Sequence, residues 1–292
     1  MHKGLMVVNA FLRTTKFDDL YHILLDAAQQ CGMELDVATN AELSPIVSTY
    51  AFDPSQYDFV LFWDKDVQLA AQLENLGMWV FNSAQSILWC DDKAQTYLQL
   101  KPHGIPMPCT ILAPKTFTNV GYPDLSFLDE VAKTLGFPIV LKECFGSFGQ
   151  QVYLLNDLES LRRKVQELAG APLLFQELIQ ESYGHDTRIN VVGGRVVASM
   201  LRRSTDSDFR SNLTLGGTMK NYTPTEEEAA LAIRATELLG LEFAGVDILF
   251  GKEGPILCEV NSNAHFKTTL ECTGVNMALE IMRHIAGKLD EA

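Results

Sequence analysis

The chain has 292 residues, enough to bury a large hydrophobic core and to divide into two or three folding units. Its 23 basic and 37 acidic residues give a formal net charge of −14, so we expect neither a nucleic-acid nor a membrane partner. Six cysteines without a C-x-x-C pair indicate reduced thiols and a cytoplasmic protein rather than a disulfide framework or a zinc site.

The first 103 residues alternate between strand and helix patterns. Short apolar runs predict strands at 4–9, 35–38, 59–62 and 79–81. Apolar residues at helical spacing predict helices at 17–31, 67–75 and 91–100. Such alternation is typical of an open parallel sheet covered by helices, so this part is predicted to be an α/β domain. Pro106 and Pro108 favour extended chain and indicate a domain boundary after residue 103.

A second unit is predicted at residues 104–178. One helix begins near Ser126 and ends at Gly136, where glycine suits a helix C-terminus, and another helix covers 158–168. Apolar runs predict strands at 139–142, 151–155 and 173–177.

The third unit is predicted at residues 179–292. A hairpin formed by 188–192 and 195–202 closes through a two-residue glycine turn. Thr225 and Glu228 form a capping box for a helix that ends at Gly240. Two further β-prone runs, 244–249 and 258–263, flank a glycine-containing turn and predict a second hairpin.

The second hairpin gathers oxygen ligands on one face. Side chains two residues apart in a strand share a face, so Glu259 and Asn261 point the same way. A turn near Lys252 and Glu253 brings Asp247 opposite or diagonal to Glu259. Two partly buried carboxylates this close would be costly without a counter-cation, and Mg²⁺ prefers oxygen ligands. These residues therefore predict a magnesium site; the alternative is a polar strand face that solvent wets.

A glycine-containing loop follows the strand that ends at Lys142. Its glycines, Gly146 and Gly149, allow backbone N–H groups to approach phosphate oxygens, and Lys142 adds a positive charge at the base of the loop; the alternative is a plain flexible hairpin loop. The loop matches neither the G-x-x-x-x-G-K-[ST] nor the G-x-G-x-x-G pattern, which disfavours P-loop and Rossmann sites. Lys93, on a predicted helix, is a candidate for a second phosphate charge, although a solvated surface lysine is the alternative.

Two further segments carry candidate ligand groups. The apolar strand 175–179 suits the edge of an adenine ring, with Glu177 placed to accept a ribose hydroxyl; the alternative is an ordinary strand with Glu177 exposed. Arginines are concentrated between 188 and 210 in an otherwise acidic chain. Planar guanidinium groups bind carboxylate and phosphoryl oxygens with two hydrogen bonds, so an anionic substrate is predicted; salt bridges to the surplus acidic residues are the alternative.

These motifs occur in the order seen in ATP-grasp ligases. They are Lys93, Lys142 with residues 145–149, Gln176-Glu177, Asp186-Thr187-Arg188, residues 209–213, Asp247 and Glu259-Val260-Asn261. The combination closely resembles the RimK-type amino-acid ligases, or alpha-L-glutamate ligases, from about Lys93 to the C-terminus. The resemblance implies α/β and α+β architecture: an ATP-grasp fold with an N-terminal open parallel α/β domain and two α+β subdomains that clamp ATP.

The resemblance also implies an activity and a set of site residues. An ATP-dependent carboxylate–amine ligase would phosphorylate a substrate carboxylate, and an amine would attack the acyl phosphate to give an amide. The amine would be an amino acid such as glutamate, and the acceptor a peptide, a protein or a small carboxylate. Magnesium, or manganese in its place, would lie on Asp247, Glu259 and Asn261. The implied ATP-binding residues are Lys93, Lys142, Gly146, Ser147, Phe148, Gly149, Gln176, Glu177, Leu178, Ile179 and Asp186. The candidates for holding the substrate carboxylate or the acyl phosphate are Arg188, Arg203, Arg210 and Asn212.

The sequence departs from the family pattern at two places. Gln151 stands where relatives typically carry a glycine, and residues 262–267 replace a proline-containing turn that borders the acceptor site. His265 in this turn either contacts substrate, accepts a proton or has a structural role. Alternative functions are an ATP-grasp dipeptide ligase, a phosphotransferase, or a nucleotide-binding regulator without turnover. The oligomeric state, a homo-oligomer included, is left open.

Overall fold

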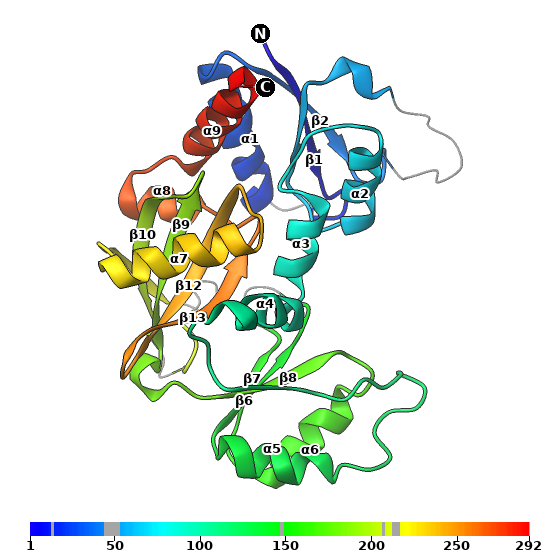
Figure 1. The fold of residues 1–292 in the computed structure, drawn as a ribbon, viewed down its shortest axis with the longest axis vertical. Coiled ribbons are helices and arrows are strands. Elements are labelled where there is room, and N and C mark those ends of the chain that lie inside the picture. Colours follow the sequence, from blue (N-terminus) through cyan, green and yellow to red (C-terminus); the bar gives the residue numbers. More distant parts are fainter. Residues whose placement is uncertain (13–14, 44–52, 147–148, 206–207, 212–216, 292) are drawn as a thin grey trace.

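The computed structural model describes residues 1–12, 15–43, 53–146, 149–205, 208–211 and 217–291, which form three sheets with their helices (Figure 1). Three of the predicted site residues, Ser147, Phe148 and Asn212, lie outside the described residues. Among the described helices, none combines the length and the apolar composition needed to cross a membrane.

The N-terminal sheet is parallel and four-stranded, in the order β2-β1-β3-β4, as the sequence predicts. Its strands are β1 (Lys3–Val8), β2 (Glu34–Thr39), β3 (Phe59–Phe62) and β4 (Val80–Phe81). The accompanying helices are α1 (Thr15–Gln30), α2 (Val67–Asn75), α3 (Ala84–Asp91) and α4 (Lys93–Leu100). Asp92 caps α4 by accepting hydrogen bonds from the backbone N–H groups of Ala94 and Gln95. This cap fixes the direction in which Lys93 leaves the helix.

The central sheet is antiparallel, in the order β5-β8-β6-β7. Its strands are β5 (Thr110–Leu112), β6 (Ile139–Glu143), β7 (Val152–Leu155) and β8 (Leu173–Glu177). Helices α5 (Phe127–Leu135) and α6 (Leu158–Glu167) lie together on one side of it (Figure 1). The predicted glycine loop joins β6 to β7 and therefore lies at an end of this sheet.

The third sheet is five-stranded and antiparallel, in the order β11-β10-β9-β12-β13. Its strands are β9 (His185–Val192), β10 (Arg195–Arg203), β11 (Thr218–Asn221), β12 (Phe243–Gly251) and β13 (Gly254–Asn261). The helices of this part are α7 (Glu226–Leu238), α8 (Lys267–Thr273) and α9 (Met277–Glu291). The predicted capping box is present, since Thr225 and Glu228 each accept a hydrogen bond from the other's backbone N–H. Gly193 and Gly194 close the β9–β10 hairpin with positive φ angles, a conformation that favours glycine.

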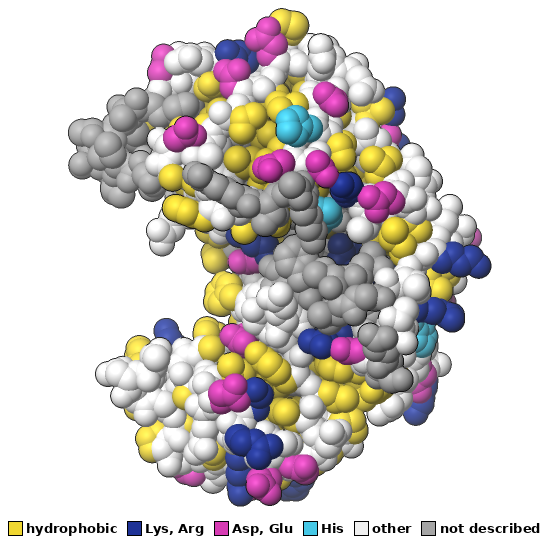
Figure 2. Space-filling model, turned by 180° about the vertical axis from the view of Figure 1, so that it is seen from behind, with side chains coloured by type: hydrophobic (Ala, Val, Ile, Leu, Met, Phe, Trp, Pro, Cys, Tyr) yellow, Lys and Arg dark blue, Asp and Glu magenta, His cyan; other side chains and the backbone are white. Residues whose placement is uncertain are grey.

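The three sheets fall within the predicted ranges 1–103, 104–178 and 179–292, but the hydrophobic cores do not follow these limits. One buried cluster joins Leu20 and Leu24 of α1 with Ile281 and Ile285 of α9. In Figure 1 these two helices lie side by side beneath the chain termini. The outline of the molecule is hollowed between this upper part and the central sheet with its helices (Figure 2).

Asn82 ties the N-terminal sheet to the β12–β13 hairpin. Its side chain follows β4 and is 1 % exposed. The amide nitrogen donates to the carbonyl oxygens of Phe243 and Ser262, each at 2.9 Å. Its oxygen accepts a hydrogen bond of 2.7 Å from the backbone N–H of Glu242. Since these partners lie at the start of β12 and directly after β13, Asn82 fixes the hairpin against the N-terminal sheet.

Replacing Asn82 with Ala is expected to lower the free energy of unfolding by roughly 2–4 kcal/mol, because it leaves buried backbone groups without hydrogen-bond partners. Urea unfolding followed by circular dichroism measures the change. The control is Asn75→Ala, at the exposed end of α2, where we expect a change within about 0.5 kcal/mol. Equal losses in the two variants would contradict the structural role of Asn82.

Candidate active site

A cleft lies between the central sheet and the third sheet, and most of the predicted nucleotide-binding residues line it. Those residues are Lys93, Lys142, Gly146, Gly149, Gln176, Glu177, Leu178, Ile179 and Asp186. Asp247, Glu259 and Arg210 line the same cleft. The first and last of these residues, Lys93 and Glu259, are more than 160 positions apart in the sequence, and the fold brings them to one surface.

The β12–β13 hairpin has the predicted geometry. Asp247 is the register partner of Glu259, and Gly245 is the partner of Asn261. The turn residues Lys252 and Glu253 connect the two strands. The two carboxylates differ in environment, because Asp247 is only 5 % exposed whereas the side chain of Glu259 is 30 % exposed.

Two arginines neutralise Asp247. Arg188, on β9, donates to both carboxylate oxygens, through Nε to Oδ1 and through Nη2 to Oδ2 at 2.8 Å. Arg202, on β10, places Nη2 at 3.0 Å from Oδ1. Burial alone would raise the pKa of Asp247, but the two guanidinium groups lower it below the ordinary value. Asp247 is therefore ionised, and the countercharge that the sequence argument assigned to a metal is supplied by the chain itself.

Asp186 anchors the second of these arginines. Arg202 Nε donates to Asp186 Oδ1 at 2.7 Å, and Nη2 donates to Oδ2. The two residues are register partners on β10 and β9, and both side chains are less than 10 % exposed. Burial opposes the charge of Arg202, yet Asp186 and Asp247 raise its pKa above the ordinary value. The carboxylate of Asp186 thus pairs with Arg202 rather than extending unpaired into the cleft.

Lys93 connects the glycine loop to the acidic hairpin. Its Nζ donates to the carbonyl oxygen of Gly146 at 3.1 Å and lies 3.5 Å from Glu259 Oε1. Its backbone N–H donates to the carbonyl of Cys144 at 3.0 Å, at the start of the same loop. The side chain is only 9 % exposed, so the alternative of a solvated surface lysine is wrong.

Lys142 supplies a second buried ammonium group. Its Nζ lies 3.9 Å from Cys258 Sγ, and among the described residues no carboxylate comes within ion-pair distance of it. Burial opposes the positive charge of Lys142. Its pKa is nevertheless raised above the ordinary value by four neighbouring acidic groups, which are Cys258, Tyr97, Glu259 and Asp247. Burial also raises the pKa of Cys258 to about 11 and that of Tyr97 to about 12, so both are neutral at pH 7. Near neutral pH the cleft therefore holds an ammonium group that lacks a direct anionic partner.

The glycine loop is held from both sides. Arg210 Nη1 donates to the carbonyl oxygens of Gly149 at 2.6 Å and Val152 at 3.4 Å, while Asp208 pairs with its guanidinium group. Gln151, which replaces the glycine of the family pattern, packs against Gly146: a Cβ at that position would lie 2.5 Å from Gln151 Oε1. The departure at Gln151 thus fills the space beside a loop glycine.

The end of β8 offers polar groups followed by an apolar wall. Gln176 is 1 % exposed and donates to Thr110 Oγ1 at 2.9 Å. Glu177 Oε1 accepts a hydrogen bond of 2.7 Å from the backbone N–H of Cys109. Leu178 and Ile179 follow directly and line the cleft. Such a segment suits a flat aromatic base, because its side chains supply apolar contacts and its backbone supplies hydrogen-bonding groups.

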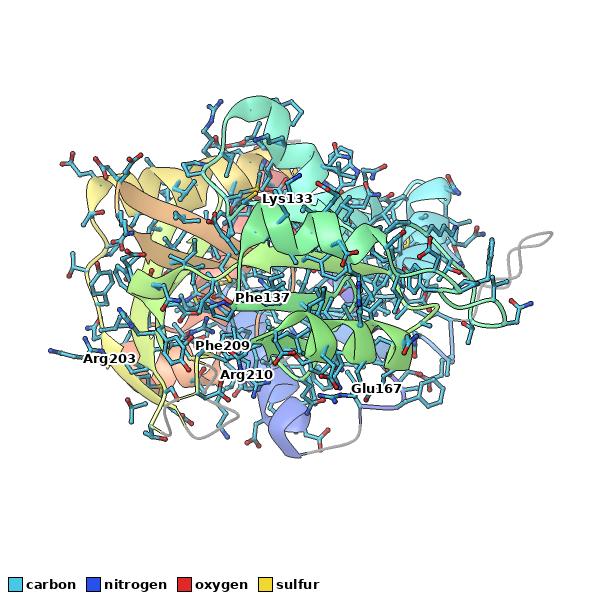
Figure 3. The ribbon with its side chains drawn as sticks, turned by 90° about the horizontal axis from the view of Figure 1, so that it is seen from below. Lys133, Phe137, Glu167, Arg203, Phe209 and Arg210 are labelled. Carbon is cyan, nitrogen blue, oxygen red and sulfur yellow. The ribbon has the colours of Figure 1, made fainter. Side chains whose placement is uncertain are left out.

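Not every predicted residue reaches the cleft. Arg203 is exposed at the end of β10 and points outward at the edge of the molecule, whereas Phe209 and Arg210 lie between the sheets (Figure 3). Arg202, one residue earlier, points into the cleft and is the residue that the sequence argument missed. The alternation of side chains in a strand could have identified it, because Arg202 pairs with Asp186 across the predicted β9–β10 hairpin.

Three other candidates lie beside the cleft. Arg188 and Asn261 do not belong to its lining, and Asn261 Nδ2 donates to the carbonyl of Gly245 at 3.3 Å. The ring of His265 packs edge-on against Phe17, with 6.2 Å between ring centroids. Lys267 pairs with Asp19 of α1. The turn after β13 thus rests on the N-terminal helix.

The donor set fits a hard cation only in part. Among the described residues, no group of three His, Cys, Asp or Glu side chains is placed to hold a metal. Asp247, Glu259 and the amide oxygen of Asn261 are the oxygen donors that the hairpin brings together. Mg²⁺ accepts two or three protein oxygens when substrate phosphates and water complete its shell. The residues therefore fit magnesium that arrives with a nucleotide.

Comparison with known proteins identifies relatives of this chain. Human N-acetylaspartylglutamate synthase A is 39 % identical over 205 residues, covering 70 % of this chain and 51 % of that protein. A probable alpha-L-glutamate ligase from Xanthomonas euvesicatoria is 37 % identical over 217 residues, covering 73 % of this chain and 70 % of the relative. The chain spans about half the length of the first curated relatives that it matches.

The fold is shared with a solved structure and with a family model. A RimK domain ATP-grasp protein from Sphaerobacter thermophilus superposes with a TM-score of 0.75, covering 96 % of this chain and 98 % of that one at 22 % identity. The predicted ATP-grasp fold is thus confirmed. Residues 90–285 match the model of the RimK-like ATP-grasp domain. The chain therefore belongs to the RimK-like ATP-grasp family.

Proposed function

We propose that the protein is an ATP-dependent carboxylate–amine ligase that forms an amide through an acyl phosphate. The observation that carries the proposal is the convergence of four features in one cleft: the ammonium groups of Lys93 and Lys142, the glycine loop, and the Asp247–Glu259 pair. Buried ammonium groups beside a loop of approachable backbone N–H groups are suited to phosphates.

ATP would lie between the central and third sheets. Leu178 and Ile179 would contact the adenine, and Glu177 would accept a ribose hydroxyl. Lys142 and Lys93 would neutralise the phosphates, with the loop around Gly146 covering them. Phosphoryl transfer asks mainly for positioning and charge stabilisation, so these contacts account for most of the catalysis expected of the protein.

Magnesium is the metal that the donor set favours, with manganese as a substitute of the same coordination chemistry. Glu259, Asp247 and Asn261 would hold it. When bound, the ion would neutralise negative charge on the phosphate oxygens.

The arginines would hold the second anionic substrate. Arg202 replaces Arg203 in this assignment, because only Arg202 lines the cleft. Arg210 contacts the glycine loop and would couple closure of the loop to the anion beneath it. Arg188 lies on the other side of Asp247, toward the turn after β13, where the substrate carboxylate would approach. A neutral amine needs no dedicated base to attack the acyl phosphate.

Glutamate is the amine that the relatives support. The names of the human synthase and the Xanthomonas ligase both include glutamate. The carboxylate would come from a small acid or from a peptide. A cytoplasmic location agrees with the free state of all six cysteines and with the supply of ATP there.

The test is product analysis with glutamate and a series of small carboxylic acids. We expect ADP and phosphate to appear in step with an amide, hydroxylamine to trap the activated carboxylate as a hydroxamate, and EDTA to stop all three. AMP with pyrophosphate would refute the acyl-phosphate route. A stable phosphorylated product would identify a phosphotransferase, and ATP binding without turnover under every condition would identify a regulator.

A further inference from the structure

We infer that Arg188 and a divalent cation compete for Asp247, so that Arg188 is released toward the substrate side when the metal–nucleotide complex binds. This inference rests on the proposed metal role of Asp247. It assigns Arg188 a function beyond static charge pairing: its guanidinium group becomes available to an anionic substrate only after the cation has taken its place.

The geometry at Asp247 favours such an exchange. Arg188 covers both carboxylate oxygens with two parallel hydrogen bonds, and Arg202 shares one of the same oxygens. A cation would need at least one of these oxygens at roughly 2.1 Å, and the three N–H donors already occupy most of the acceptor sites of the carboxylate. A dication would also repel a guanidinium group that stays in place. Charge repulsion therefore favours the release of one arginine when the cation binds.

Arg188 is the arginine that can move. Arg202 is fixed by two further hydrogen bonds to Asp186, its register partner, and both side chains are buried. Among the described residues, the hydrogen bonds of Arg188 Nε and Nη2 go to Asp247. Breaking that pair frees the whole guanidinium group, whereas moving Arg202 would also leave the carboxylate of Asp186 buried without its partner.

The position of Arg188 sets the direction of its release. Its side chain runs beside Gly245, where a Cβ would come within 3.2 Å of Arg188 Cδ and Nη1 and within 2.5 Å of Ala264 Cβ. The guanidinium group thus lies between the β12–β13 hairpin and the turn that contains Ala264. Because Arg188 does not line the nucleotide cleft, a displaced guanidinium faces the turn rather than the phosphates. Metal and nucleotide are therefore expected to bind before an anionic substrate.

The experiment measures Mn²⁺ binding to the full chain without nucleotide, from the electron paramagnetic resonance signal of free Mn²⁺. Arg188→Gln is expected to bind Mn²⁺ at least tenfold more tightly than the wild type. Arg203→Gln removes the same charge from an exposed position nearby, and we expect its affinity to change less than twofold. Unchanged or weaker Mn²⁺ binding by Arg188→Gln, or equal tightening in both variants, would overturn the exchange.

Two further proteins separate this inference from the proposed function. Glu259→Gln should lose the Mn²⁺ site; if it binds Mn²⁺ as the wild type does, the metal assignment and the exchange both fail. If binding depends on Glu259 but does not tighten in Arg188→Gln, the exchange alone fails. Arg188→Lys keeps the charge but loses the paired hydrogen bonds, and an intermediate affinity is expected. If thermal unfolding shows that Arg188→Gln is not folded, the Mn²⁺ affinity of Arg188→Lys decides the test in its place.

Discussion

Glu259→Gln is expected to lower the rate of ATP turnover by roughly 10²–10³-fold while the free energy of unfolding changes by less than about 1 kcal/mol. Glu259 is the more exposed of the two hairpin carboxylates, and Lys93 lies 3.5 Å from it. The fold therefore depends little on its charge, whereas the cation and the phosphates depend on it strongly. ADP release in a coupled assay and thermal unfolding measure the two effects.

Two comparisons make this result specific to the metal site. Glu253→Gln changes an exposed carboxylate in the turn of the same hairpin, and we expect both turnover and stability to stay near wild type. Asp247→Asn should lose turnover together with roughly 3–5 kcal/mol of stability, because it withdraws the countercharge from Arg188 and Arg202 in a buried site. Wild-type turnover in Glu259→Gln would remove Glu259 from the metal site.

The β12–β13 hairpin is a feature that the sequence alone predicts. The period of two and the turn glycines were sufficient to predict that Asp247 lies opposite or diagonal to Glu259, and the structure makes the two residues register partners. The parallel N-terminal sheet was likewise predictable from apolar runs that alternate with helical patterns. These features depend on neighbours along the chain, and local sequence carries that information.

The charge network could not be predicted in the same way. Asp247 meets Arg188 and Arg202 only because β9 lies between β10 and β12 in the sheet, an order that the sequence does not specify. Arg203, which was predicted to hold an anion, is exposed, whereas Arg202 lines the cleft, because one position along a strand reverses the direction of the side chain. The sequence therefore predicted a metal ion as the countercharge of Asp247, where the fold also supplies two arginines.

Several elements were also missed for identifiable reasons. Helix α3 buries polar and apolar residues alike, with Ser86 beside Ile87 and Cys90, so it lacks a clear apolar stripe. Strand β11 has four residues, three of them exposed, and owes its conformation to pairing with β10. Helix α9 does carry a buried stripe that includes Ile281 and Ile285, a pattern that was present in the sequence and was not assigned.

Replacing Lys142 with Met should weaken ATP binding about tenfold or more and slow phosphoryl transfer roughly 10²-fold, because it removes a preorganised charge from the phosphate site. Lys142 is 8 % exposed, so the lost ammonium group cannot be replaced readily by solvent. Titration calorimetry with a non-hydrolysable ATP analogue measures affinity, and ADP release under saturating ATP measures transfer.

The stability of the same variant separates a binding role from a structural one. Methionine fills a similar volume, and among the described residues Lys142 has no carboxylate in ion-pair contact to be left unpaired. We therefore expect the free energy of unfolding to fall by less than about 1 kcal/mol.

Lys133→Met, on the outer surface of α5, is the matched control, since its side chain is 75 % exposed and its loss should affect neither binding nor turnover (Figure 3). If Lys142→Met binds and turns over ATP like this control, the buried ammonium group has no role at the phosphates. If Lys142→Met is partly unfolded, but its folded fraction binds ATP with the affinity of the wild type, Lys142 is instead a structural residue.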